Sequence, residues 1–230
     1  MVARQLTLDL PARPALGRSD FFVSPANRTA LTLIDAWPDW PDGRLAVAGP
    51  RGAGKTHVAH VWAARAHADI VPAAALARLG PGEVPDAAAL AVEDVDALAE
   101  MDPAEARAIE ETLFHLCNRL RAGGGSLMVT GREAPAHWRL GLPDLASRLG
   151  AAAVARLEPP DDALLAAVLL KLFADRQIAV GPELIAYLVA RMDRSFEAAE
   201  MLVMRLDRAG LAAHRRITPR LAAEVLKAEA

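Results

Sequence analysis

Apolar residues follow two different rhythms along the chain. Up to about residue 158, short apolar runs alternate with stretches of helical spacing, and beyond that point only helical spacing is found. The short runs predict strands over 44–48, 69–71, 90–92, 126–130 and 152–157. Because strands that alternate with helices build a parallel sheet with helices on both faces, the pattern predicts an α/β fold.

Helix signals separate these strands. Ser24-Pro25 is typical of a helix start, with serine as N-cap and proline in the first turn, and this helix is expected to run to about Ala36. A second helix is expected over 58–66. Asp102-Pro103 predicts the start of a third helix, which ends at the glycines 123–125.

The pattern changes at Pro159-Pro160. Helices are expected after it over 161–176, 182–192, 195–212 and 218–229. The chain is therefore expected to have three parts. They are a tail over 1–20, an α/β nucleotide-binding domain over 21–158 and a small all-helical lid over 159–230.

The segment after the first strand carries the most informative chemistry. It is a complete phosphate-binding loop (P-loop) in the strand–loop–helix order that such a site requires. Its glycines let backbone N–H groups converge on one point, Lys55 supplies a charge for the outer phosphates, and the Thr56 hydroxyl can ligate magnesium. The alternative is a Gly/Pro turn that matches by chance. The predicted nucleotide contacts are Gly49, Pro50, Arg51, Gly52, Ala53, Gly54, Lys55, Thr56 and His57.

Two acidic residues directly follow the third expected strand. Beside a P-loop, Glu93 would face the magnesium ion and Asp94 the attacking water. The alternative is that both acids only solvate the end of a strand.

Composition limits the classes of protein that fit. The 230 residues are 53% hydrophobic, which is enough for a sizeable core, and the net charge of −3 does not favour bulk electrostatic binding to DNA. A single cysteine, Cys117, excludes an internal disulfide and is expected to be a small core residue. The sequence shows no signal peptide and no run long enough to span a bilayer, so a cytoplasmic location is expected.

Four stretches together resemble the AAA+ module of the DnaA initiator family, and most closely the short DnaA-related regulators of the Hda family. They are the P-loop, the Phe21-Phe22-Val23 segment with Asn27, the stretch 140–149 and the helical C-terminal part. The resemblance implies a P-loop AAA+ core with a parallel sheet and a helical lid. It also implies that Phe22, Val23 and Asn27 border the adenine of a bound nucleotide.

In that family the arginine matching Arg148, in Leu-Pro-Asp-Leu-Ala-Ser-Arg-Leu, is an arginine finger. It reaches across a subunit interface to the γ-phosphate held by a neighbour and neutralises charge on the transferring phosphoryl group. The alternative for Arg148 is a surface salt bridge with a nearby acid such as Asp144.

The tail resembles a short motif by which replication proteins dock on the β sliding clamp. In Gln5-Leu6-Thr7-Leu8-Asp9-Leu10, Leu6, Leu8 and Leu10 supply the apolar side chains, and the Gln5 amide can form paired hydrogen bonds at a groove rim. The alternative is an ordinary amphipathic strand, because apolar and polar residues alternate.

The sequence departs from the family pattern at three positions. Glu93 stands where the initiators usually have Asp, and Arg132 stands where a short polar sensor residue is usual. Glu197 occupies the place of the lid arginine that senses nucleotide, and Arg194, one turn earlier, is the expected substitute. These changes favour a nucleotide holder over a fast ATPase.

The function implied by the resemblance is regulation of replication initiation. We expect an adaptor that binds ADP or ATP with Mg²⁺, docks on the DNA-loaded clamp and promotes hydrolysis of the ATP held by DnaA. Contact with DNA is expected only through the clamp, no membrane is involved, and a homodimer is a further candidate. Two alternatives stay open: a self-acting AAA+ ATPase such as a helicase loader, and a scaffold that nucleotide merely stabilises.

Overall fold

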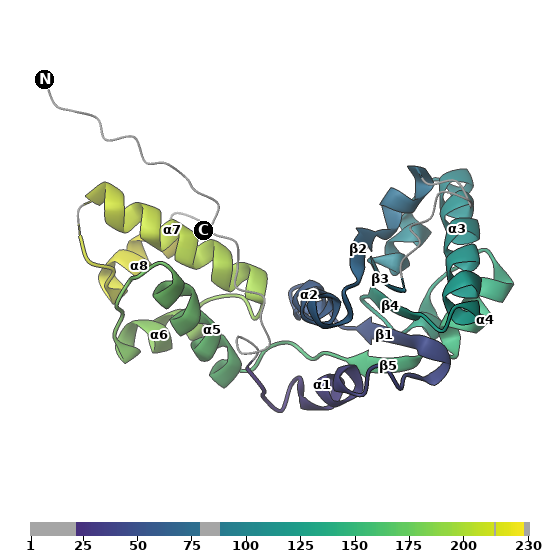
Figure 1. Cartoon of the computed structure of the whole chain (residues 1–230). Coiled ribbons are helices and arrows are strands. Elements are labelled where there is room, and N and C mark those ends of the chain that lie inside the picture. Colours follow the sequence, from purple (N-terminus) through teal and green to yellow (C-terminus); the bar gives the residue numbers. More distant parts are fainter. Residues whose placement is uncertain (1–21, 79–87, 214, 228–230) are drawn as a thin grey trace, which may run out of the picture.

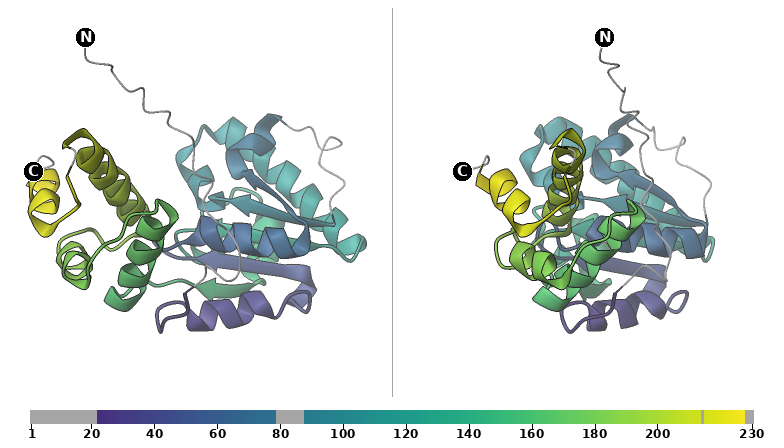
Figure 2. Two further views of the ribbon diagram at one scale, coloured as in Figure 1. Left: turned by 60° about the vertical axis from the view of Figure 1, so that its left-hand side comes forward. Right: turned by 90° about the vertical axis from the view of Figure 1, so that its left-hand side faces the viewer.

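The computed structural model describes residues 22–78, 88–213 and 215–227. An α/β part holds a single sheet with its covering helices, and four helices, α5 to α8, form a second part beside it (Figure 1). The left view of Figure 2 shows the same division, with the C-terminal helices gathered on one side of the molecule.

All strands of the sheet are parallel. Their bounds are Arg44–Ala48 (β1), Asp69–Pro72 (β2), Ala89–Glu93 (β3), Ser126–Gly131 (β4) and Ala153–Arg156 (β5). Their order across the sheet is β2-β3-β4-β1-β5. The carboxyl ends of β3, β4 and β1 therefore lie side by side, and this edge of a parallel sheet is where ligands bind.

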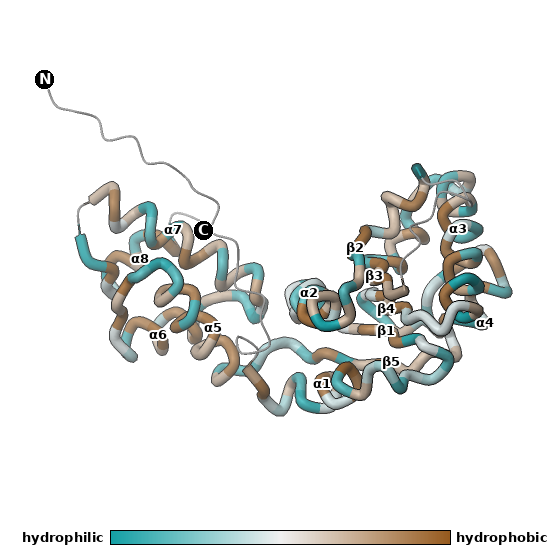
Figure 3. Tube along the Cα trace, in the orientation of Figure 1, coloured by the Kyte–Doolittle hydropathy of each residue, from teal (hydrophilic) through white to brown (hydrophobic). Residues whose placement is uncertain are grey.

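Alternate side chains of the strands face two helical layers. Leu45 and Met128 pack against α1 (Arg28–Asp35) and α2 (Lys55–Ala66), where Trp62 is almost fully buried. Because β1 and β4 are buried along their whole length, they appear in the sequence as continuous apolar runs. Figure 3 shows this as a concentration of hydrophobic colour along the central strands.

The opposite face of the sheet is covered by α3 (Pro103–Ala122) and α4 (Pro143–Gly150). Leu90 and Val129 point into this layer, and Cys117 of α3 is buried there, as the sequence predicts. Short 3-10 segments in the described part of this domain are Pro41–Gly43, Ala73–Arg78, Val95–Glu100 (η4) and Pro135–His137.

The helical part has a core of its own. The helices of this part are Asp162–Asp175 (α5), Pro182–Val189 (α6), Phe196–Ala213 (α7) and Pro219–Lys227 (α8). Phe173, Leu188 and Leu206 are fully buried between these helices. Each helix overlaps the range expected from the spacing of apolar residues.

Two expected helix starts differ from the structure. The helix expected over 58–66 is α2, which already begins at Lys55. The helix expected from Ser24-Pro25 begins at Arg28, because the residues before it form a turn. The Asn27 Oδ1 accepts from the Ser24 N–H at 2.9 Å, and the Ser24 hydroxyl accepts from the Ala26 N–H at 3.2 Å. These side chains close the turn, so Ser24 does not cap the helix.

Candidate functional site: the phosphate-binding loop and its surroundings

The P-loop connects β1 directly to α2. Gly52 and Gly54 have φ values of +74° and +93°, a left-handed conformation that residues with a Cβ rarely adopt. The Gly49 N–H donates to the Gly131 carbonyl at 3.2 Å, which ties the start of the loop to the end of β4. The sequence motif therefore folds as a turn at the carboxyl edge of the sheet, followed by a helix N-terminus.

Lys55 is the first residue of α2 and is buried inside the loop, with 8% of its surface exposed. Its ammonium donates to the Gly49 carbonyl at 2.8 Å and to the Pro50 carbonyl at 3.1 Å. Burial lowers the pKa of Lys55; the acids at the end of β3 and in η4 oppose this shift, and Arg132 adds to it. The charge of Lys55 is thus held at the centre of the loop, within electrostatic reach of these three acids, Glu93, Asp94 and Asp96.

The two acids predicted from the sequence lie at the end of β3. Asp94 is exposed and adopts a left-handed backbone (φ 56°), and its N–H donates to the Thr130 hydroxyl at 3.0 Å. Thr130 is buried at the end of β4, so this bond joins the ends of neighbouring strands. A non-glycine residue in this conformation is a local strain of the kind found at functional sites.

Glu93 and Thr56 are the residues that could hold a magnesium ion. The Glu93 Oε1 is buried and has no hydrogen-bond partner among the described residues, and a buried carboxylate oxygen without a partner is costly unless a cation or donor meets it. Thr56 is exposed in the first turn of α2, where its hydroxyl can complete a set of oxygen ligands with phosphate and water. The donor set therefore fits Mg²⁺ bound together with a nucleotide.

Arg132 extends the site on the β4 side. Its backbone N–H donates to the Asp96 carboxylate at 3.0 Å, and its guanidinium lies 3.4 Å from a Glu100 oxygen. Asp96 and Glu100 belong to η4, a short helix that apolar spacing did not predict. Asp96 therefore fixes the chain after β4.

The segment that resembles an adenine border lies on the β5 side of the P-loop. The Glu158 N–H, just beyond β5, donates to the Ala26 carbonyl at 3.2 Å. The Asn27 amide donates to the Phe22 carbonyl at 2.9 Å, so Asn27 is buried and shapes the turn. Phe22 and Val23 are 40% and 62% exposed. Two apolar side chains are therefore left uncovered on this turn.

Arg148 lies near the end of α4, on the α3 side of the sheet. Its guanidinium carbon stands 4.8 Å from the centre of the Phe114 ring, a cation–π contact that holds the side chain without neutralising it. Among the described residues, none of the ion pairs involves Arg148, so the expected alternative of a salt bridge with Asp144 is not seen in that part of the chain.

Sequence reasoning missed Glu110, which positions α4. Glu110 of α3 is 3% exposed, and its two carboxylate oxygens accept from the Gly141 N–H at 2.8 Å and the Leu142 N–H at 2.6 Å. These bonds fix the chain just before α4, the helix that carries Arg148. An acid at the edge of an apolar helix stripe gave no signal of this role, because its partners lie 31 and 32 residues later.

Two lid residues that the sequence singled out face different partners. Arg194 forms an ion pair with Asp162 at the start of α5 and lies 3.5 Å from the Pro160 carbonyl. Glu197, at the start of α7, forms an ion pair with Arg51 of the P-loop. The structure thus places Glu197, and not Arg194, against the P-loop residues.

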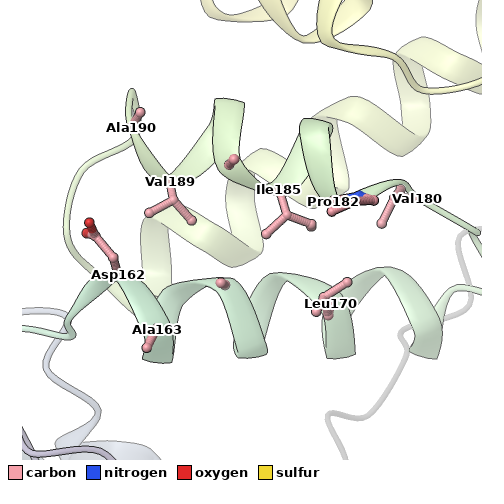
Figure 4. Close-up of a pocket in the computed structure, with 10 residues that line it drawn as sticks. Asp162, Ala163, Leu170, Val180, Pro182, Ile185, Val189 and Ala190 are labelled. Atoms are coloured by element: carbon pink, nitrogen blue, oxygen red, sulfur yellow. The ribbon is translucent and has the colours of Figure 1, made fainter.

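A separate apolar hollow lies within the helical part. It has a volume of about 630 Å³ and lies between α5 and α6, where Leu170, Val180, Ile185 and Val189 line it (Figure 4). It includes no P-loop residue and so is separate from the site above.

Two further findings concern the described residues only. No helix there is long and apolar enough to cross a membrane, and no group of three or more His, Cys, Asp or Glu side chains is arranged to hold a metal ion. The clamp-motif residues Gln5, Leu6, Leu8 and Leu10 lie outside the described residues, as does Phe21.

Comparison with solved structures shows which known fold this arrangement matches. No protein-family model matches the sequence. Domain III of the replication initiation protein DnaA from Thermotoga maritima is similar at TM-score 0.78 and 18% identity, over 95% of this chain and 98% of that chain. This chain has the fold of a P-loop AAA+ ATPase domain.

Two more similar structures support this assignment. One is a DnaA bound to AMPPCP and single-stranded DNA, at TM-score 0.72 and 16% identity, over 88% of this chain and 67% of that chain. The other is the RuvB Holliday junction branch migration motor from Thermotoga maritima, at TM-score 0.59 and 17% identity, over 87% and 66%. At these identities the likeness shows the fold alone, and it does not show which reaction the chain takes part in.

Proposed function

We propose that this chain is an AAA+ nucleotide-binding regulator that docks on the DNA-loaded sliding clamp and promotes hydrolysis of ATP bound to the initiator DnaA, limiting re-initiation. Its own site holds ADP or ATP with Mg²⁺, and its arginine acts on the nucleotide of its partner. The observation that carries the proposal is a complete P-loop in a DnaA-like fold, together with an arginine on α4 that is held in place and keeps its charge.

Nucleotide binding is supported by the geometry around Lys55. The lysine ammonium, the N-terminus of α2 and the glycine turn converge on one point, which suits the phosphates of a nucleotide. The partnerless Glu93 oxygen and the exposed Thr56 suit the accompanying magnesium ion. When bound, Mg²⁺ would neutralise charge on the phosphate oxygens. A DnaA of similar fold binds AMPPCP, an analogue of ATP.

The action on a partner is supported by Arg148. An arginine finger needs a fixed guanidinium that is not already neutralised by a carboxylate. Stacking on Phe114 fixes Arg148 in this way, and Glu110 fixes the start of its helix. Such fingers are worth about a thousandfold or more in rate.

The experiment combines the purified protein, clamp loaded on DNA and ATP-bound DnaA, and measures phosphate release. We expect Arg148→Ala to lower the stimulated release by about a thousandfold. The matched control is Arg220→Ala, which removes an exposed arginine from α8 and should leave release unchanged. Equal release by the Arg148→Ala and wild-type proteins would contradict the finger role.

The tether to the clamp is a separate part of the proposal. It rests on the resemblance of residues 5–10 to a clamp-binding motif, and tethering would raise the local concentration of the regulator near replicating DNA. A pull-down with purified clamp tests it, using the Gln5→Ala, Leu8→Ala double variant. Retained binding would remove the tether and leave the nucleotide and finger roles in place.

A second candidate function, hydrolysis in the chain's own site, is favoured by the acids at the end of β3. Asp94 is exposed beside the loop, where it could orient an attacking water. Turnover of ATP without DnaA, with loss of turnover but not of binding in Asp94→Ala, would support this candidate. Unchanged turnover in Asp94→Ala would reject the role of Asp94.

A further inference from the structure

The tip of the P-loop is covered by the lid. The Phe196 N–H, at the start of α7, donates to the Gly52 carbonyl at 3.0 Å. A Cβ on Gly52 would lie 2.2 Å from the Ser195 Cβ, and one on Gly54 would lie 2.8 Å from a Phe196 ring carbon. Figure 1 shows the corresponding end of α7 beside the start of α2. The first residues of α7 therefore rest directly on two glycines of the loop.

A bidentate ion pair fastens the same contact. The Arg51 Nε donates to one Glu197 oxygen at 3.2 Å, and its Nη2 donates to the other at 3.1 Å. Two parallel bonds fix the relative orientation of the two groups as well as their distance. The pair therefore joins a P-loop side chain to α7 without any group of a nucleotide.

The other lid arginines near this contact have their own partners. Arg194 is paired with Asp162 of α5, and the Arg191 guanidinium lies 3.9 Å from the centre of the Tyr187 ring. The charged lid residue that contacts the loop is thus an acid, Glu197, which would repel a phosphate if it were not paired. Arg51 neutralises this acid, so the lid contacts the loop through protein groups.

We infer that Arg51 and Glu197 form a latch that holds α7 on the P-loop independently of the third phosphate of a nucleotide. This inference rests on the proposed nucleotide binding and makes the pair the reason that the closed lid does not distinguish ADP from ATP. With the latch closed, the protein binds ADP and ATP with similar affinity and has the same lid position with either one.

Hydrogen exchange read by mass spectrometry tests the latch on the whole chain. The reporter is the peptide containing Phe196, whose N–H bonds to Gly52 in the closed position. Without nucleotide, Arg51→Glu and Glu197→Arg should each speed its exchange about two- to fivefold, the range expected for an exposed pair. The charge-swapped double variant should restore the wild-type rate. Both side chains are mostly exposed, 83% and 57%, so the variants should fold as the wild type does, which circular dichroism checks.

The control is Arg220→Glu, which reverses an exposed charge on α8 and should leave the exchange rate of the Phe196 peptide unchanged. Wild-type protein with ADP and with ATP should show equal protection of the reporter, and calorimetry should give dissociation constants within about threefold of each other.

Three results would overturn the latch: single variants without effect, a swap that does not restore the rate, or protection at least tenfold greater with ATP than with ADP. Failure of the wild-type protein to bind either nucleotide would overturn the proposed function instead. The swap experiment, done without nucleotide, still decides for or against the latch in that case.

Discussion

The α/β domain and the helical lid contribute to one site by different means. In the α/β domain each functional group follows a buried strand: the P-loop follows β1, Glu93 ends β3 and Arg132 follows β4. Sheet register therefore fixes their positions. The lid contacts the P-loop through Glu197, whose side chain is more than half exposed, whereas Arg194 is paired with Asp162 inside the helical part.

This difference predicts two kinds of behaviour. Groups fixed by buried strands or buried hydrogen bonds should cause large losses when they are removed. Exposed ion pairs contribute about 0–1 kcal/mol each, so changes in the lid contacts should tune affinity and lid position by small steps. The following predictions test this division, in order of decreasing effect.

Lys55→Ala should cause the largest change in the α/β domain after the loss of the arginine finger. Hydrogen bonds to a charged group contribute about 1.5–3 kcal/mol each, so loss of the proposed contacts between the Lys55 ammonium and the phosphates should weaken nucleotide binding by about 100-fold or more. Calorimetric titration with ADP measures this. Lys227→Ala, at the exposed end of α8, is the control. Nucleotide binding by Lys55→Ala at wild-type strength would contradict the role of Lys55 in holding the phosphates.

Glu110→Ala should destabilise the α/β domain by about 3 kcal/mol, because it leaves two partly buried N–H groups, at Gly141 and Leu142, without their charged acceptor. The neighbouring Glu111→Ala removes only an exposed pair with Arg107 and should cost less than about 0.5 kcal/mol. Urea unfolding of both variants gives the two values. Similar values would show that the buried carboxylate does not fix the start of α4.

The pH dependence of the unfolding free energy tests whether Cys117, in the same layer, is buried. Burial raises the pKa of its thiol from 9.0 to about 11. The unfolded thiol therefore loses its proton first, and the stability contributed by Cys117, complete below pH 9, is lost as the pH rises toward 11. Between pH 8 and pH 10 the wild type should lose about 1 kcal/mol more stability than Cys117→Ala in urea unfolding. Parallel pH dependence in the two proteins would contradict this burial.

Arg194→Ala tests whether an exposed ion pair of the lid has only a small effect. If Arg194 serves mainly to pair with Asp162, the variant should lose at most about 1 kcal/mol of stability and bind ATP within about threefold of the wild type. Thermal unfolding and calorimetry measure the two effects. A tenfold or larger loss of ATP affinity would instead assign to Arg194 the nucleotide contact that the sequence indicates.

The strands and the phosphate site could be predicted because their signals are local. A strand buried on both faces requires a continuous apolar run, and a phosphate loop requires glycine, lysine and threonine at fixed spacing. The start of α1 was placed wrongly because the Ser24 and Asn27 side chains bond to backbone in a turn, a choice that local propensity does not decide.

The contacts that could not be predicted join residues far apart in the sequence. Arg51 and Glu197 are separated by 146 positions, and each alone is an ordinary exposed charge. Glu110 lies on a helix where a polar residue is expected to be solvated, and only the fold shows which N–H groups it meets. Such pairs depend on how the domains pack, which the spacing of apolar residues does not encode.

Calorimetric titration of the wild-type protein with ADP and with ATP, each with Mg²⁺, tests the central claim most directly. The account predicts saturable binding of about one nucleotide per chain, with similar affinity for both. If neither nucleotide gives heat of binding at any accessible concentration, the P-loop does not hold a nucleotide and the account is contradicted.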